Sequence, residues 1–330
     1  MPDFRSREAI AADYRDARGR GDTKGMSRFQ NEEACLVLLS VLEVLAQDED
    51  SFVHTVAIKG GILMAGELRS PRASADIDAT SGDQMRVDVD RVAREIVRAG
   101  REFAMRLDSE PERTTGGDTI HLAFDSLTDR GIAKFEISVR EDLVFNVRDA
   151  IIDLTEIGLA VFTVPAVAKV ELVAEKLRCL VQRAQPRDLF ALRLYLVDSD
   201  WQFDPRELRQ AVEAKLATTR LKRWSSDAWR VHLEEIEPLW EPTLLEWVSP
   251  DHLPSFEDAV RDVEGRLRQL GLGLPLRGAV TFGSPLTPRT RQGDRPAHPL
   301  GGSGPSGAPT QGGRRRAPPV ARRATTAACR

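Results

Sequence analysis

The sequence is poor in cysteine and has no long apolar run. Its 330 residues include only three cysteines, Cys35, Cys179 and Cys329. They are odd in number and far apart, which argues against a disulfide framework and against structural zinc, whose ligands are closely spaced. No apolar stretch approaches the roughly 20 residues that cross a bilayer, and no basic start leads into an apolar run. We therefore expect a cytoplasmic protein without a membrane segment.

Lysine and acidic residues are scarce at the C-terminal end. Residues 276–330 contain ten arginines, a single acid, Asp294, and no lysine, although the net charge of the whole chain is −4. Proline, glycine and serine cluster there, with too few apolar residues to offset the entropy of ordering. We expect residues 275–330 to form a disordered tail. It is either a dispensable extension or a segment whose arginines attract RNA non-specifically.

The overall composition is that of a soluble globular protein, since 41% of all residues are hydrophobic and 30% are charged. The length allows two domains. Strand and helix patterns alternate as far as residue 164, and only helical patterns follow Pro165. These patterns predict an α+β fold. An N-terminal segment, residues 1–25, precedes a mixed sheet with helices over residues 26–164 and an all-α C-terminal domain over residues 165–274.

Individual elements are predicted from hydrophobic period and turn residues. Apolar residues at helical spacing predict helices over residues 30–47, 62–68 and 87–107. Short β-branched or alternating runs predict strands over residues 53–58 and 75–80, and a hairpin formed by residues 119–124 and 132–139. Beyond the boundary, helices are predicted over residues 166–184, 187–198, 205–222, 225–240 and 255–270.

Two carboxylates lie on one face of the predicted strand over residues 75–80. Asp76 and Asp78 are two residues apart, and such side chains on a strand point the same way. Hard oxygen ligands of this kind suit Mg²⁺ or Mn²⁺ rather than zinc. Glu136, on the polar face of a hairpin strand, is the candidate third ligand. The alternative interpretation is a solvated strand with outward acids and an ordinary exposed glutamate.

Glycines and basic residues accompany the acid pair. Gly60 and Gly61 lie between a predicted strand and a predicted helix, where the absence of side chains lets a phosphate approach the backbone. Lys59 and Arg72 add positive charge nearby. A plain glycine turn flanked by exposed basic residues is the alternative.

A row of cations follows the predicted helix over residues 166–184. Lys169, Lys176 and Arg183 recur at every seventh residue and so lie along the border of the apolar stripe. This row can neutralise a triphosphate, or its stems can cover apolar surface while the charged ends reach water. Asp188 opens the next helix, where an acid also interacts favourably with the helix dipole.

Four motifs occur in an order that matches a known family. They are Ile58-Lys59-Gly60-Gly61, Arg72-Ala73-Ser74-Ala75-Asp76-Ile77-Asp78, Lys134-Phe135-Glu136-Ile137-Ser138, and Glu175-Lys176 with Arg183 and Arg187-Asp188-Leu189-Phe190. As a set, they resemble the AbiEii/AbiGii toxin family of the polymerase-β-like nucleotidyltransferase superfamily, which includes MenT-type toxins. The resemblance covers roughly residues 28–200. One position departs from it, because Ala191 stands where the family often has a second acid.

The resemblance implies a nucleotidyltransferase head followed by a helical domain, encoded beside an antitoxin. Asp76 and Asp78 look like the catalytic metal ligands, Lys176 like the triphosphate-binding lysine and Asp188 like the catalytic acid of the last motif. Glu136 completes the expected metal set. The expected nucleotide-binding residues are Lys59, Gly60, Gly61, Arg72, Ser74, Lys176 and Arg183.

The expected activity is metal-dependent transfer of a nucleoside monophosphate from an NTP to the 3′ end of a tRNA, with release of pyrophosphate. The cofactor is Mg²⁺ or Mn²⁺, and the expected partner is a cognate antitoxin. Three alternatives remain open: a small-molecule nucleotidyltransferase, a protein nucleotidyltransferase, and a non-catalytic module that binds an NTP or a partner. The missing second acid at Ala191 is the feature that keeps the last alternative in view.

Overall fold

A computed structural model describes residues 5–81, 87–139, 143–217 and 226–272. These residues belong to one compact unit. The tail that the sequence predicts to be disordered, residues 275–330, lies outside the described residues. No helix within the described ranges is long and apolar enough to span a membrane.

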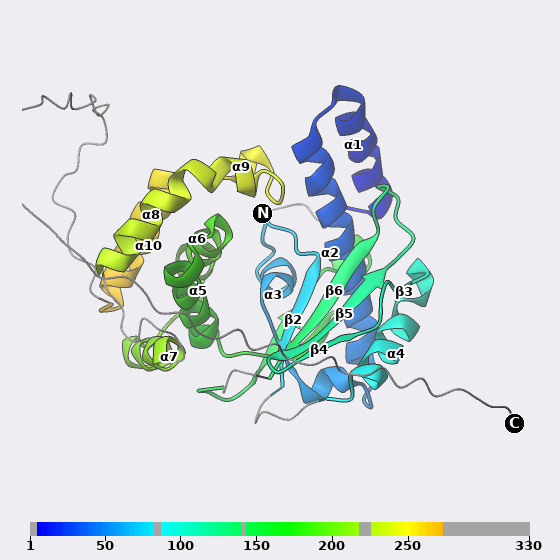
Figure 1. Ribbon diagram of the computed structural model, residues 1–330, viewed down its shortest axis with the longest axis horizontal. Coiled ribbons are helices and arrows are strands. Elements are labelled where there is room, and N and C mark those ends of the chain that lie inside the picture. The colour runs from blue at the N-terminus through cyan, green and yellow to red at the C-terminus, as the bar shows by residue number, and fades with distance from the viewer. Residues whose placement is uncertain (1–4, 82–86, 140–142, 218–225, 273–330) are drawn as a thin grey trace, which may run out of the picture. The chain divides into compact units, whose positions relative to one another are not determined.

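An eight-stranded mixed sheet forms the centre of the described chain (Figure 1). Its strand order is β3-β5-β6-β2-β1-β8-β7, with β4 paired to β5. β2 runs antiparallel to β1 and parallel to β6, and the predicted hairpin is confirmed as the antiparallel pair β5 and β6. The strands are β1 (Ala57–Lys59), β2 (Asp76–Thr80), β3 (Arg106–Leu107), β4 (Glu112–Thr114), β5 (Gly117–Ala123), β6 (Ile132–Ser138), β7 (Arg148–Ile152) and β8 (Phe162–Ala166).

Some helices pack against this sheet and others mainly against one another, and all regular structure described after β8 is helical. The helices are α1 (Arg7–Arg20), α2 (Thr23–Gln47), α3 (Gly61–Gly66), α4 (Val89–Ala99), α5 (Lys169–Arg183), α6 (Pro186–Arg193), α7 (Pro205–Ala217), α8 (Ser226–Ile236), α9 (Trp240–Leu244) and α10 (Phe256–Gln269). A π-helical turn over Leu194–Asp198 continues α6. Several short 3₁₀ turns join the other elements.

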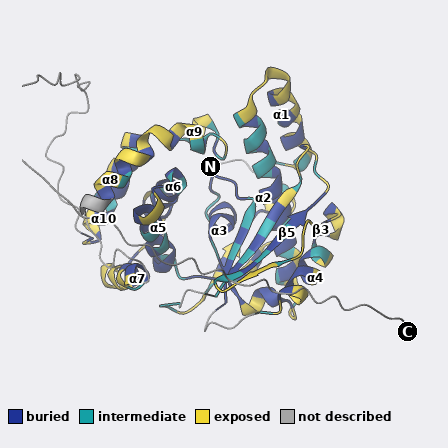
Figure 2. Ribbon diagram, viewed as in Figure 1, coloured by how far each residue is buried: buried dark blue, intermediate teal, exposed yellow. Residues whose placement is uncertain are grey.

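α2 is the central core helix of the sheet region. Its N-cap Asp22 accepts a hydrogen bond from the Gly25 amide, and its middle is apolar on nearly every face. Val37, Leu38 and Leu42 are fully buried, and α2 contacts β2, β6 and β8. Figure 2 shows the buried residues concentrated where α2 and the strands meet. This packing fixes the buried face of β2 and so directs the other face toward solvent.

Several predicted elements differ from the structure. Residues 53–58 were expected to be one strand, but a 3₁₀ turn, η1 (Phe52–Thr55), precedes β1. Side-chain hydrogen bonds favour the turn, because the Phe52 amide donates to Glu95 and the Val53 amide donates to the Ser51 hydroxyl.

The predicted helix over residues 87–107 is also divided. It becomes α4, a 3₁₀ turn over Arg101–Phe103, and β3. The chain leaves the helical path at Gly100, and Ala104 adopts a left-handed conformation with φ of 49°.

Strands β7 and β8 had no counterpart among the predicted elements. β8 pairs in parallel with β1 and joins Ile58 to Ala166, so the boundary expected at residue 165 falls inside a strand of the sheet. The division into separate sheet and helical domains stays a prediction.

Candidate active site

Acidic side chains and one lysine lie together on one face of the sheet. Because β2 and β6 pair in parallel, Asp78 lies beside Glu136 and Asp76 beside Lys134. Ile77, between the two aspartates, points into the core and is fully buried. Lys134 Nζ lies 2.9 Å from Glu136 Oε1 and 3.6 Å from Asp76 Oδ2. The strand period therefore places Asp76 and Asp78 on one face, as the sequence predicts.

The electrostatic balance of these carboxylates differs between the strands. Burial raises the pKa of both Asp76 and Asp78, although Lys134 opposes this at Asp76 and Lys176 opposes it at Asp78. Burial also acts to raise the pKa of Glu136, but the hydrogen bond and charge of Lys134, together with Asp78 and His121, outweigh it and the net shift is downward. The protein thus compensates the charge of the two aspartates only in part. A bound cation would improve that balance.

The aspartate pair has donor chemistry that fits a divalent cation, since carboxylate oxygens are the ligands that Mg²⁺ and Mn²⁺ prefer. Within the ranges that the structure describes, no group of three or more His, Cys, Asp or Glu side chains is arranged to hold a metal ion. Glu136 is engaged by the ammonium group of Lys134, which also lies near Asp76. The metal roles of Asp76, Asp78 and Glu136 stay a prediction.

The glycine turn after β1 is required by the close approach of two side chains of the candidate site. Gly60 has φ of 77°, and a Cβ atom there would lie 2.1 Å from Asp78 Oδ2. A Cβ atom on Gly61 would lie 2.3 Å from Ser74 Oγ. Ser74 is buried, and its hydroxyl donates to the Asp76 carbonyl oxygen at 3.2 Å. Larger residues at either glycine would displace the groups that shape this site.

Cations from α5 meet an acid from α6. Arg183 donates two hydrogen bonds of 2.8 Å to the two oxygens of Asp188. Lys176 Nζ lies 3.5 Å from Asp188 Oδ1. The Asp188 side chain is fully buried, and its hydrogen bond raises the pKa of Arg183 above the ordinary arginine value. One carboxylate therefore fixes the positions of two cations.

Two further arginines have donors available. Arg72 is 6% exposed, and burial, then the nearby Arg187, lower its pKa. The guanidinium of Arg72 lies 5.5 Å from the centre of the Trp247 ring. Among the described residues, the buried Nε atoms of Arg72 and Arg187 have no hydrogen-bond partner. Buried donors without a partner are costly, and an anion beside them would remove that cost.

A cavity of about 240 Å³ brings these groups together, and eight basic and five acidic side chains of the described chain line it. The predicted residues that line it are Lys59, Gly60, Gly61, Arg72, Ser74, Asp76, Asp78, Glu136, Lys176 and Arg183. Asp188 does not line the cavity but holds Lys176 and Arg183, which do. Lys169, the first member of the predicted cationic row, lies 4.7 Å from the Trp201 ring centre instead.

Sequence reasoning did not single out Glu171, Arg178 and Lys215, which line the cavity. It quoted Lys134, Glu175 and Arg187 as motif residues but gave them no role in the site, although they also line it. The spacing of Glu171, Glu175 and Arg178 along α5 could have placed them on one helix face. Burial acts to raise the pKa of Glu175, but the hydrogen bond from Arg178 and the positive charges of Lys59, Arg178 and Lys215 lower it to about 2. Lys215 comes from α7, and its Nζ lies 2.9 Å from a carboxylate oxygen of Glu171. The two residues are far apart in the sequence, so no local pattern indicates this ion pair.

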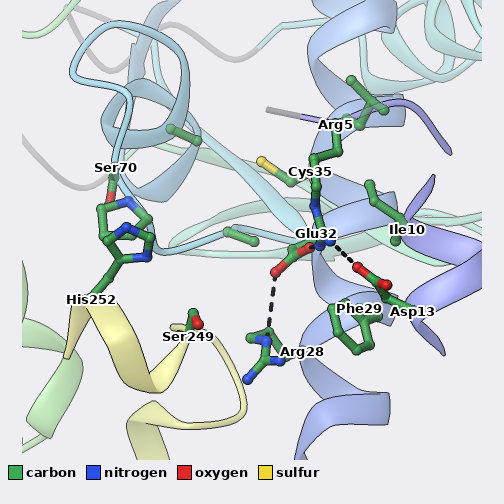
Figure 3. A pocket seen from close by; sticks show the side chains of 14 residues that line it. Arg5, Ile10, Asp13, Arg28, Phe29, Glu32, Cys35, Ser70, Ser249 and His252 are labelled. Atoms are coloured by element: carbon green, nitrogen blue, oxygen red, sulfur yellow. Dashed lines mark hydrogen bonds and ion pairs between the residues drawn. The ribbon is translucent and has the colours of Figure 1, made fainter. Parts of the chain in front are cut away.

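A second cavity lies between α1, α2 and the loop before β2 (Figure 3). Arg5 and Arg28 both pair with Glu32, at 2.5 Å and 3.7 Å, and Arg5 also pairs with Asp13. Figure 3 shows these charged groups directed toward one another. None of the predicted site residues lines this cavity, and its arginines already have carboxylate partners.

The acid pair, the cationic residues and the glycine turn occur within a stretch that matches a family model. The model for "Nucleotidyl transferase AbiEii toxin, Type IV TA system" matches residues 43–262. The chain belongs to the AbiEii nucleotidyltransferase toxin family. It is therefore a nucleotidyltransferase of a type IV toxin–antitoxin system. No match was found among curated proteins.

The fold is shared with a solved member of the toxin class. MenT4, a nucleotidyltransferase toxin from Mycobacterium tuberculosis, is similar with a TM-score of 0.56 and 17% identity, over 80% of this chain and 89% of that protein. A candidate nucleotidyltransferase from H. pylori has a TM-score of 0.47 and 14% identity, over 73% of this chain and 94% of that protein. At 17% identity the likeness to MenT4 concerns the fold alone.

The AbiEii-family chain departs from the usual last motif at Ala191. This residue is fully buried in α6 and does not line the cavity. Asp188, one turn earlier, already contacts both Lys176 and Arg183. The contacts that orient the two cations are thus present without the second acid.

Proposed function

We propose that this AbiEii-family protein transfers a nucleoside monophosphate from an NTP to the 3′ end of a tRNA and releases pyrophosphate. The observation that carries the proposal is one cavity in which Asp76 and Asp78 lie close to Lys176, Arg183 and Arg187. An NTP in transfer needs carboxylates for its cations and cationic groups for its phosphates.

The carboxylates are the proposed metal ligands. Asp76 and Asp78 would hold Mg²⁺ or Mn²⁺, with Glu136 as a third ligand once Lys134 releases it. The bound ions would lower the pKa of the attacking hydroxyl and offset charge at the α-phosphate. The role of the protein groups is then to hold the acceptor hydroxyl in line with the bond that breaks.

The cations are the proposed triphosphate ligands. Lys176 and Arg183 offset the charge that grows on the departing pyrophosphate, and Asp188 keeps both aimed at it. Arg72 and Arg187 contribute buried donors without a partner among the described residues, which suits phosphate oxygens. Lys59, Gly60, Gly61 and Ser74 complete the nucleotide site along the turn after β1.

The proposal divides the work between two parts of the chain. The sheet of a polymerase-β-like head supplies the carboxylates, and an all-α domain over residues 165–274 supplies Lys176, Arg183 and Asp188. We also propose a cognate antitoxin as partner and the cytoplasm, where tRNA and NTPs occur, as the place of action. Family membership supports the antitoxin.

The test is to incubate the purified protein with Mg²⁺, total tRNA and each α-labelled NTP in turn, and to follow label and pyrophosphate together. Labelled tRNA with equimolar pyrophosphate supports the proposal. Labelled protein or a labelled small molecule would replace tRNA as the acceptor. NTP binding without pyrophosphate release under any of these conditions would contradict transfer.

A further inference from the structure

A third cavity adjoins the proposed nucleotide site at its acidic end. Asp76 and Lys134 line both cavities, so the two spaces meet at the proposed catalytic aspartate. The third cavity is lined by residues of α2, β5, β6 and the segment after α9, including Gln30, Asn31 and Trp247. None of the cationic residues of α5 and α6 lines it.

A row of polar side chains leads from the nucleotide site into this cavity. Asp76 lies beside Lys134, and Lys134 lies beside His121 on the next strand. The amide of Asp108 then donates to the His121 carbonyl at 2.9 Å. The row crosses the sheet from β2 to its outer strands and remains accessible to solvent. These side chains line one side of the third cavity and connect it to the proposed site of reaction at Asp76.

In-line transfer requires an entry on this side. In the proposed reaction the pyrophosphate departs toward Lys176 and Arg183, so the attacking oxygen approaches the α-phosphorus from the opposite direction. The space that adjoins Asp76 and contains neither of these cations is the third cavity.

The lining suits the end of a single-stranded nucleic acid. Trp247 offers a partly buried indole on which a base can stack. The Trp247 backbone is held in place because its carbonyl accepts a hydrogen bond from the Ala73 amide. Asn31 and Gln30 bring amide groups that can pair with base edges. Their amide nitrogens already donate to the backbone of Glu246 and Thr128, at 3.0 Å each, which orients both side chains.

The rim carries one cation that is available to phosphate. Arg130 is exposed and, among the described residues, makes no ion pair. Asp108 and Glu246 are exposed on the same rim, and their carboxylates favour hydroxyl and amino groups over phosphate. A cavity with such an exposed rim leaves room for the remainder of a long chain, which an enclosed small-molecule pocket does not.

We infer that this cavity is the acceptor site, and that it takes the 3′-terminal nucleotides of an RNA with a base against Trp247 and a phosphate at Arg130. The inference rests on the proposed nucleotidyl transfer and adds the residues that choose the acceptor. Trp247, Arg130, Asn31 and Gln30 are the specificity-determining residues.

Arg130→Ala is the first test, because an exposed arginine is removed without loss of packing. The KM for RNA is expected to rise about tenfold, with kcat and the KM for NTP unchanged, since one charge-assisted contact is lost. The slope of log KM for RNA against log salt is expected to fall by about 0.7. Arg98→Ala is the matched control, because Arg98 is 65% exposed and pairs with Asp48 away from the cavity.

Trp247→Leu is the second test, because it keeps apolar volume but removes the stacking face. It is expected to raise the KM for RNA about tenfold and the KM for NTP by less, because Arg72 of the proposed nucleotide site lies 5.5 Å from the centre of the Trp247 ring. The thermal midpoint is expected to remain near wild type. An unchanged KM for RNA in both variants, with active wild type, overturns the acceptor site and leaves the proposed transfer standing. If wild type labels only a protein or a small molecule, the RNA acceptor is overturned; if it labels nothing, the transfer itself fails.

Discussion

Asp188→Asn should separate positioning from chemistry in the nucleotide site. The carboxylate of Asp188 is fully buried and contacts Arg183 at 2.8 Å through both oxygens and Lys176 at 3.5 Å. Asparagine has nearly the same shape but no charge, and it replaces one acceptor oxygen by a donor. Arg183 then loses its bidentate partner, and Lys176 loses the nearby charge that holds it beside the cavity.

The expected magnitudes follow from exposure. Breaking a buried ion pair costs about 3 to 5 kcal/mol. Because the Arg183 side chain is 42% exposed and can be hydrated, we expect a loss of only about 2 kcal/mol in the free energy of unfolding. The loss in kcat is expected to be about 100-fold, as for other oriented groups that stabilise developing charge.

Arg193 and Asp198 provide a matched control for this change. They form an ion pair of 2.6 Å with the same spacing of five residues, and neither lines the nucleotide cavity. Asp198→Asn should leave transfer unchanged. The assay measures kcat and KM with α-labelled NTP, together with urea unfolding of both variants. A folded Asp188→Asn protein with transfer within twofold of wild type would refute the positioning role.

Three further outcomes test other parts of the structure. Glu33→Gln should lower the free energy of unfolding by about 2 kcal/mol at pH 7, because buried Glu33 accepts from Arg7, Ser126, Thr128 and the Leu127 amide. These bonds outweigh burial and lower the Glu33 pKa in the folded protein. The ionised Glu33 therefore contributes to the free energy of unfolding above its unfolded pKa, and this contribution is lost as pH falls through the folded pKa. Urea titrations should show the stabilities of wild type and variant converging in acid, and a difference that stays constant with pH would contradict this account. Gly60→Ala should abolish transfer because the added methyl group clashes with Asp78. Gly19→Ala is the control and should keep activity, because nothing lies within 4 Å of a Cβ atom there; equal activity of the two variants would contradict the steric explanation. Chelation of divalent ions should stop label transfer, and added Mg²⁺ or Mn²⁺ should restore it; transfer that persists with the chelator would exclude the metal requirement.

Local patterns indicated many of the residues that the structure brings to one cavity. The period of β2 places Asp76 and Asp78 on one face, and the sequential motifs bring Gly60, Gly61 and Lys176 to the same cavity. These features depend on neighbours within a few residues or on one family pattern. They can therefore be predicted from the sequence alone.

Long-range contacts were not predictable in the same way. Lys134 alternates with Glu136 on β6, but its contact with Asp76 depends on the parallel pairing of β2 and β6. The pairing of Glu171 with Lys215 joins α5 to α7. The pairing of β8 with β1 brings together residues about a hundred positions apart, and no local period indicates it.

The most direct measurement compares wild type with Asp78→Asn in magnesium, tRNA and the preferred α-labelled NTP. We predict equimolar labelled tRNA and pyrophosphate from wild type, and at least a roughly 100-fold lower rate from a variant that keeps its thermal midpoint. Wild-type transfer rates in folded Asp78→Asn protein would contradict the assignment of the acid pair as the catalytic centre.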